Sequence, residues 1–123
     1  MIEALANRFA LERPLPTADV SGLVRGTDRE DAGRAVDIAY LGASTGSAIK
    51  ERFLERAAAL AKVKNAGIAT TAGHGSTEDG VCFLAMYRPE GESLDTRIAR
   101  GAMTLEGLAK VIDRVLAALD FAH

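Results

Sequence analysis

Apolar and polar residues alternate in the first third of the chain, which is the pattern of short β-strands. Val36, Ile38 and Tyr40 fall on one face of the clearest such segment, and the residues between them fall on the other face. A charged turn at 28–33 precedes this segment. Because the connections are short, an antiparallel arrangement is favoured. The three predicted strands are residues 9–13, 22–27 and 34–41.

The apolar spacing then widens to one residue in every three or four, which predicts a helix. This helix follows a loop at 42–47 and is expected to end near Lys64. Two further strands are predicted at 67–72 and 80–86, with the polar turn GHGSTED between them. A short helix is expected at 93–99, followed by a longer final helix. The apolar positions of the first helix are Ile49, Phe53, Ala57, Leu60 and Ala61.

Residues suited to helix ends flank these segments. Thr45 and Ser47 are candidate N-caps of the first helix, and Thr104 is the candidate N-cap of the last. Asn65 and Gly67 are suitable residues to end the first helix.

The order of elements predicts the α+β class. Three strands, a helix, two strands and two helices indicate a five-stranded antiparallel sheet with one packed helix, followed by a helical appendage. A chain of 123 residues has the length of one domain. With 48% hydrophobic and 26% charged residues, its composition is that of a globular protein rather than a disordered one.

Charge and residue counts exclude several classes of function. The net charge of −2 gives no basic excess that would indicate a nucleic acid or an anionic membrane. The lone Cys82 excludes an internal disulfide and a cysteine-rich zinc site, and we expect it to be a core thiol. His74, expected on the surface, and His123 are too few for a histidine-rich metal centre. Without a long apolar run or an apolar leader, a cytoplasmic domain is expected.

Several segments in unbroken order carry a resemblance to a known family. They are RFALERPL, LVRGTD, AGRAVDIAYL, KERFLERAAALAKVKNAGI, CFLAMYRPEGESLDTRIARG and LEGLAKVIDRVLAALDFAH. Together they resemble the small lobe of a protein kinase, in particular the bacterial serine/threonine kinases of eukaryotic type. The resemblance implies a kinase N-lobe over 1–87, and a hinge with the helical start of the large lobe over 88–123. The catalytic loop H-R-D-x-x-x-x-N and the metal-binding D-F-G are absent from the sequence.

The resemblance also implies that the phosphate-covering loop is degenerate. In kinases, a glycine-rich loop lets bare backbone close over the phosphates of ATP. The three glycine positions fall here on Pro16, Ala18 and Ser21, and the following valine position falls on Leu23. Pro16 lacks a backbone N–H, and the other two residues add side chains where backbone should approach closely.

The V-A-I-K motif of the family, which aligns with residues 36–39, is changed in the same direction. Ala39 takes the place of the lysine that holds the phosphates, and Asp37 takes the place of the small residue above the adenine. Both positions project to one face of the strand, so that face loses a cation and gains an anion. Such a carboxylate repels a phosphate by roughly a few kcal/mol. Arg56 replaces the partner glutamate. It either reaches Asp37 in a rewired pair or lies on a solvated face.

The hinge is closer to the family pattern. Met86 corresponds to the residue behind the adenine pocket, and Tyr87, Arg88 and Pro89 correspond to the hinge. Pro89 removes one possible donor near the adenine edge. His123 corresponds to a histidine at the end of a helix, where the resemblance implies a packing role.

Three functional hypotheses remain. The preferred one is a degenerate, pseudokinase-like domain without phosphotransfer activity or cofactor, acting as a protein-interaction or regulatory module or representing a truncated kinase. The alternative is the N-terminal part of a serine/threonine protein kinase that uses ATP and Mg²⁺. The third is a small α+β binding protein to which the resemblance does not apply.

The last helix is the predicted partner-binding surface. In a complete kinase this helix is buried in the large lobe, so the resemblance leads us to expect an exposed apolar stripe here. We expect this stripe to bind another protein or a second copy of the chain. Its residues are Leu105, Leu108, Ile112, Val115, Leu119 and Phe121.

Overall fold

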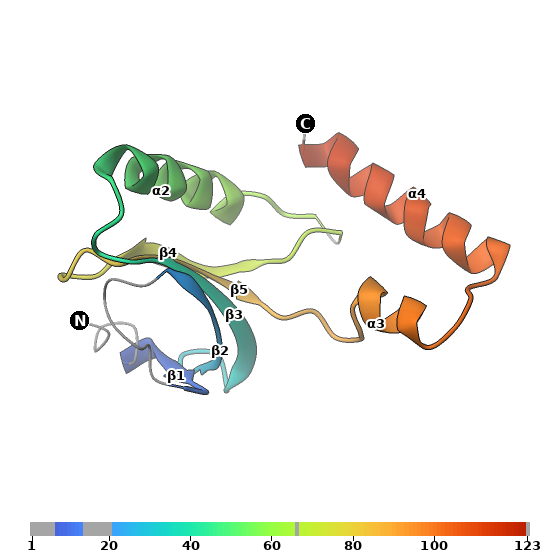
Figure 1. Ribbon diagram of the computed structural model, residues 1–123, viewed down its shortest axis with the longest axis horizontal. Coiled ribbons are helices and arrows are strands. Elements are labelled where there is room, and N and C mark those ends of the chain that lie inside the picture. The colour runs from blue at the N-terminus through green and yellow to red at the C-terminus, as the bar shows by residue number, and fades with distance from the viewer. Residues whose placement is uncertain (1–6, 14–20, 66, 123) are drawn as a thin grey trace. The chain divides into compact units, whose positions relative to one another are not determined.

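The structure is a computed structural model that describes residues 7–13, 21–65 and 67–122. Five strands form one antiparallel sheet in the order β1-β2-β3-β5-β4 (Figure 1). This arrangement confirms the predicted α+β class with a helix between the third and fourth strands. The elements are β1 (Phe9–Leu11), β2 (Gly22–Asp28), β3 (Arg34–Leu41), α2 (Ser47–Ala61), β4 (Thr71–Ser76), β5 (Cys82–Tyr87), α3 (Leu94–Ala99) and α4 (Leu105–Ala122).

The chain divides into two compact units. The first holds the sheet and α2, and comprises the chain up to Val63 together with Thr70–Arg88. The second holds α3 and α4, and comprises Lys64–Ala69 together with the chain from Pro89 onward.

The core of the first unit lies on one face of the sheet, where the strand alternation places it. Val36 and Ile38 are fully buried and Tyr40 is nearly so, so the face of β3 that these three residues share, as predicted, is the one that packs in the core. Burying side chains of this size stabilises a fold by about 1.5–3 kcal/mol each relative to leaving them in water. Phe9 packs edge to face on Phe83 across this core, with ring centroids 6.5 Å apart. The core cluster is Phe9, Val24, Val36, Ile38, Tyr40, Val81 and Ala85.

Strands β1 and β2 approach each other closely at Gly26, which lies opposite Leu11. A Cβ atom at this position would lie 2.7 Å from the backbone oxygen of Ala10. Real Cβ atoms essentially never come so close to a backbone oxygen, so a side chain here would force the strands apart. The absence of a side chain at Gly26 therefore allows β1 to join the sheet.

The fourth strand lies at Thr71–Ser76, not at 67–72 as the sequence predicts. Its residues are aligned by pairing with β5, with Thr71 opposite Met86 and Ser76 opposite Cys82, and a bulge lies between Thr71 and Gly73. The glycine-rich sequence between 73 and 76 predicts a turn, and this prediction is wrong. Backbone pairing, rather than apolar alternation, decides the structure of this segment.

The actual turn between β4 and β5 lies just beyond these residues. Thr77 donates its backbone N–H to the oxygen of Val81, and its Oγ1 accepts from the N–H of Val81 at 3.2 Å. Gly80, at φ +85°, supplies the left-handed conformation that this turn requires.

The candidate N-caps of the first helix are wrong, and that of the last helix is confirmed. The N-cap of α2 is Gly46, which makes no side-chain cap hydrogen bond, so neither Thr45 nor Ser47 caps this helix. At the last helix the prediction is confirmed, because Oγ1 of Thr104 accepts from the backbone N–H of Gly107 at 3.0 Å.

Helix α2 is slightly shorter than predicted. It ends at Ala61 with Lys62 as the C-cap. Asn65 does not end the helix but forms a local turn, in which its Oδ1 accepts from the N–H of Gly67 at 2.8 Å.

Helix α4 presents a row of exposed apolar side chains, which range from 41% exposed at Leu108 to 83% at Leu105. Within the described residues, no helix is long and apolar enough to cross a membrane. The apolar residues of α4 with high exposure are Leu105, Leu108, Ile112, Val115, Leu116, Leu119 and Phe121.

Candidate functional site

The candidate pocket positions on the three central strands gather on one face of the sheet. Leu23 lies directly opposite Ala39, and Asp37 lies directly opposite Met86. Residues directly opposite each other in a sheet project to the same side. Leu23, Asp37, Ala39 and Met86 therefore share the face away from the buried core, which we call the cleft face. Pro16 and Ala18 lie outside the described residues.

Ser21 is used by the fold itself. Its Oγ accepts a hydrogen bond from the backbone N–H of Gly42 at 2.8 Å. This contact ties the residue preceding β2 to the residue following β3. It uses one acceptor site of Ser21, the one polar side chain among the described loop positions.

Asp37 pairs with Arg88. The Nη2 and Nε atoms of Arg88 lie 3.0 and 3.2 Å from Oδ1 of Asp37, and both side chains are about one-third exposed. The backbone N–H of Arg88 also donates to the oxygen of Ala35 at 3.0 Å. Arg88 is thus held to β3 by both its backbone and its side chain.

This pairing decides between the two interpretations of Arg56. Arg56 is exposed on α2 and forms no ion pair with any described residue, so the rewired pair with Asp37 is not formed. The register of the sheet explains the outcome. Met86 faces Asp37, and Arg88 lies two residues further on, which makes it the diagonal neighbour of Asp37. The β3–β5 register, had it been derived from the sequence, would have indicated Arg88 as the partner.

The charges on the cleft face differ from the family pattern. Ala39 contributes no charge and Arg88 pairs with Asp37, whereas Arg25, directly opposite Asp37 on β2, adds an exposed guanidinium to this face. Across the described part of the chain, no group of three or more histidine, cysteine or acidic side chains could hold a metal ion. Cys82 is buried as a free thiol, as predicted, and His74 is exposed on β4, as predicted. His123 lies outside the described residues.

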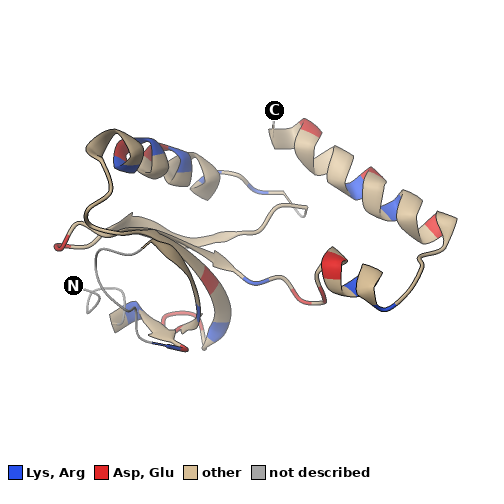
Figure 2. Ribbon diagram, in the orientation of Figure 1, with Lys and Arg blue, Asp and Glu red and all other residues tan. Residues whose placement is uncertain are grey.

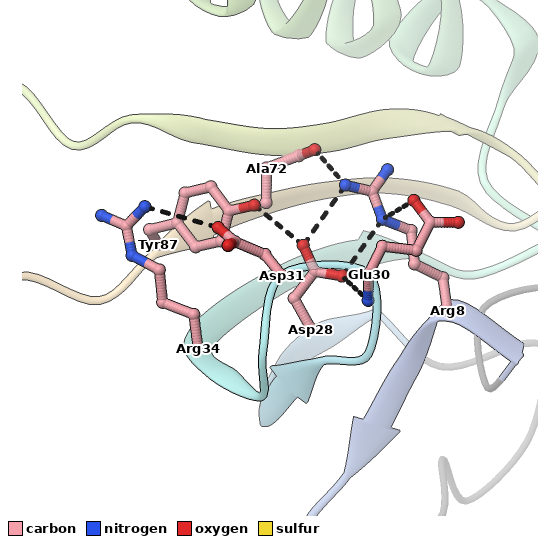
Figure 3. A network of polar contacts seen from close by, with 7 residues as sticks. All are labelled: Arg8, Asp28, Glu30, Asp31, Arg34, Ala72 and Tyr87. Atoms are coloured by element: carbon pink, nitrogen blue, oxygen red, sulfur yellow. Dashed lines mark hydrogen bonds and ion pairs between the residues drawn. The ribbon is translucent and has the colours of Figure 1, made fainter.

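A second polar cluster, centred on Asp28, was missed by the sequence analysis. The carboxylate of Asp28 is completely buried. It accepts from the Tyr87 hydroxyl at 2.8 Å and from the backbone N–H of Glu30 at 3.0 Å (Figure 3). Arg8 donates to it through Nη2 at 3.3 Å and Nε at 3.4 Å. All its oxygens therefore have donors, which is what a buried carboxylate requires.

These contacts shift the acidities of the cluster. Burial alone raises the pKa of Asp28, but hydrogen bonds from Arg8, Tyr87 and the Glu30 backbone outweigh burial and hold that pKa below its ordinary value. Burial, together with the hydrogen bond to Asp28, raises the pKa of Tyr87 to about 12. Asp28 is therefore ionised and Tyr87 is neutral across the physiological range.

The cluster ties distant segments of the first unit together. Arg8 also donates to the backbone oxygen of Ala72 on β4 at 2.7 Å (Figure 3). The Arg34 guanidinium lies 4.0 Å above the Tyr87 ring and pairs with Asp31. The end of β5 is thus fastened to the turn between β2 and β3. The sequence signal was a charged turn, which is ordinarily solvated. Of this segment only Asp28 is buried, at the end of β2, where it lies opposite Phe9 on one side and Arg34 on the other.

Comparison with known proteins identifies solved structures that share the fold described above. No protein-family model matches the sequence, and no curated protein matches it. Two crystal structures of the Mycobacterium tuberculosis PknI kinase domain match, one at 18% identity and the other, of a mutant of that domain, at 17%. Each match has a TM-score of 0.68 and covers 94% of this chain and 49% of the kinase domain. The fold is that of a protein-kinase small lobe.

The kinase small-lobe fold accounts for most of the chain. Sheet and α2 follow the order that the resemblance implies, and the chain spans about half the length of the PknI kinase domains it matches. The likeness covers the arrangement of the backbone. What the cleft face binds is a separate question, because one fold supports different functions.

Proposed function

We propose that this chain is a kinase-like module that does not transfer phosphate and instead acts through a protein partner. The observation that carries the proposal is the missing cation at position 39 of the cleft face, where Ala39 stands near the Asp37–Arg88 ion pair. The resemblance assigns a small residue and a lysine to positions 37 and 39. A carboxylate with its own arginine and a methyl group stand there instead.

The cleft face lacks the cation that the resemblance assigns to position 39. Phosphoryl transfer depends on positioned cations that neutralise the phosphates. A triphosphate that recruited Arg88 would leave Asp37 without its partner and place two anions together. Because the pair is part-exposed, breaking it costs only about 1 kcal/mol. The missing cation at position 39, and not the strength of the pair, therefore dominates the expected loss of affinity.

The intact fold favours a role as a module. The side chains of the core remain apolar and buried, and Asp28 has a complete set of donors. The changes lie at positions assigned to nucleotide handling, whereas positions that build the sheet remain suited to it. A chain that keeps its folded core while its nucleotide-handling positions change still offers a surface to partners, without requiring ATP or Mg²⁺.

The alternative is the N-terminal part of an ATP-dependent serine/threonine kinase, which the likeness to the PknI kinase domain favours. In that case ATP and Mg²⁺ would bind at the cleft face despite Ala39. The two proposals therefore differ in a measurable quantity, the affinity of the cleft face for Mg-ATP.

Thermal unfolding with increasing Mg-ATP tests the proposal. Any ligand of the native state raises stability by RT ln(1 + [L]/Kd), which is about 2.7 kcal/mol at a hundredfold excess over Kd. We expect no rise in the melting temperature of the wild-type chain. The matched variant Asp37→Ala/Ala39→Lys, which restores the family residues, is expected to respond more than the wild type. A saturable rise for the wild type would favour the kinase alternative.

A further inference from the structure

An apolar groove runs between α2 and the sheet of the first unit. It encloses about 340 Å³ and lies beside Leu84, the residue on β5 that faces Ala39. Two of its large apolar side chains are exposed, Ile49 at 58% and Leu60 at 37%. Exposed apolar side chains that line one concave surface indicate a binding surface. The lining residues are Leu41, Ile49, Arg52, Phe53, Arg56, Ala57, Leu60 and Leu84.

The groove is lined by two arginines, Arg52 and Arg56. Arg52 and Arg56 are four residues apart and therefore lie on the same side of α2, about 6 Å apart along its axis. Neither forms an ion pair with any residue that the structure describes. Figure 2 shows the basic and acidic positions that share this helix. A matching occupant has an apolar surface bordered on one side by carboxylates.

Helix α4 carries such a surface. Asp113 and Asp120 are seven residues apart, or nearly two helical turns, so they lie on the same side. At 100° per residue, this acidic row borders the exposed apolar stripe that includes Leu116. Neither aspartate has an ion-pair partner among the described residues, whereas Glu106 pairs with Lys110 within α4 at 3.7 Å.

We propose that α4 of one copy binds the α2 groove of a second copy, with Asp113 and Asp120 facing Arg52 and Arg56. This rests on the proposed function as a protein-interaction module and names its partner. Each copy has both surfaces, so each copy supplies an α4 helix and a groove to its partner. The aspartates lie about 10 Å apart along α4, and the flexible arginine side chains span the difference.

The two parts of the contact have different roles. Burial of the apolar stripe in the groove drives association, because that surface leaves water in both copies. The charge pairs select the partner and the register, since like charges at these positions oppose the contact. Reversing the charges therefore separates the proposed contact from nonspecific apolar association.

The test is a charge-reversal exchange on the full chain, with mass measured by sedimentation equilibrium. The wild type is expected at twice the 12.9 kDa of one chain. Arg52→Glu/Arg56→Glu and Asp113→Arg/Asp120→Arg are each expected to weaken association at least tenfold. An equimolar mixture of the two variants is expected to restore the dimer, because both contacts then join opposite charges. Circular dichroism checks that each variant is folded.

A matched control keeps the readout specific. Glu51→Arg/Glu55→Arg changes two exposed charges on the same helix that do not line the groove, and is expected to leave association within twofold of the wild type. A wild-type monomer would overturn the proposal, as would a dimer that ignores the charge reversals or a mixture that stays monomeric. Nucleotide titration is independent of these outcomes. If the chain is monomeric and does not bind Mg-ATP, only the proposed dimer is excluded. If the chain is dimeric and binds Mg-ATP, only the proposed function is excluded.

Discussion

Asp28 shows how much of the sheet depends on one buried carboxylate. Its partners come from three separate segments, through Arg8, Glu30 and Tyr87. We predict that Asp28→Asn lowers the free energy of unfolding by about 2–4 kcal/mol, because Arg8 and the Tyr87 hydroxyl lose a charged acceptor. Tyr87→Phe removes one hydrogen bond and is expected to cost about 1–2 kcal/mol. Urea denaturation measures both values. Equal effects of the two variants would contradict the central position of Asp28.

The shifted pKa values of Asp28 and Tyr87 make the stability of the fold depend on pH in a defined direction. Asp28 has a pKa below its ordinary value of about 3.9. Its contribution to the free energy of unfolding is therefore present above that pH and is lost as the pH falls through the pKa of the folded state. Tyr87 has a raised pKa, so its contribution is present below about pH 10 and is lost as pH rises toward about 12.

Urea denaturation across pH tests these signs. We predict that stability falls below about pH 4 and again between about pH 10 and 12. Tyr87→Phe is expected to flatten the alkaline fall and to leave most of the acid fall in place. An alkaline fall of the same size in Tyr87→Phe would show that Tyr87 is not its source.

At the residue scale, the sequence indicated which positions differ from the kinase pattern but not which residues they contact. The loss of a cation at Ala39 and the gain of an anion at Asp37 are visible in the sequence. The partner of Asp37 depends on the β3–β5 register, which places Arg88 diagonally opposite. No local pattern fixes a register between strands that lie forty residues apart, so Arg56 remained a candidate.

Among the elements, the pairing of β1 with β2 depends on Gly26. We predict that Gly26→Ser destabilises the chain by about 1–3 kcal/mol, because the added atoms meet the backbone of Ala10. Gly46→Ser makes the same chemical change at the N-cap of α2, where nothing lies within 4 Å. Because serine is a good N-cap, this control is expected to be neutral or slightly stabilising. Thermal unfolding compares them, and equal losses in both variants would contradict the close approach at Gly26.

The accuracy of the sequence prediction varied with the element. β2, β3 and α2 were located within a few residues, because apolar periodicity reports directly on a buried face. β4 was displaced by about four residues. Its Gly73 and Gly75 carry no side chains to form a pattern, and the strand is held by pairing with β5 and by the contact of Arg8 with Ala72.

On the scale of the whole molecule, the backbone resembles a kinase small lobe, whereas the residues of the cleft face differ from the kinase pattern. The backbone follows the protein-kinase small lobe across most of the chain. Tyr87, the last residue of β5, is bonded to Asp28, and Arg88, which follows it, is paired with Asp37. Asp37, which the resemblance assigns to the nucleotide pocket, is thus paired within the first unit. We expect partner binding, not nucleotide binding, to determine what this chain does.

The most direct test of this account is an NMR titration of the isotopically labelled chain with Mg-ATP. The backbone amides of Leu23, Ala39 and Met86 report on the cleft face, and that of Gly107 in α4 serves as a reference outside the first unit. We predict no saturable change at the three cleft-face amides up to millimolar nucleotide, a range that covers dissociation constants of about 1 mM or tighter. Saturable shifts at these amides, with none at Gly107, would show that the cleft face binds ATP and would contradict the account.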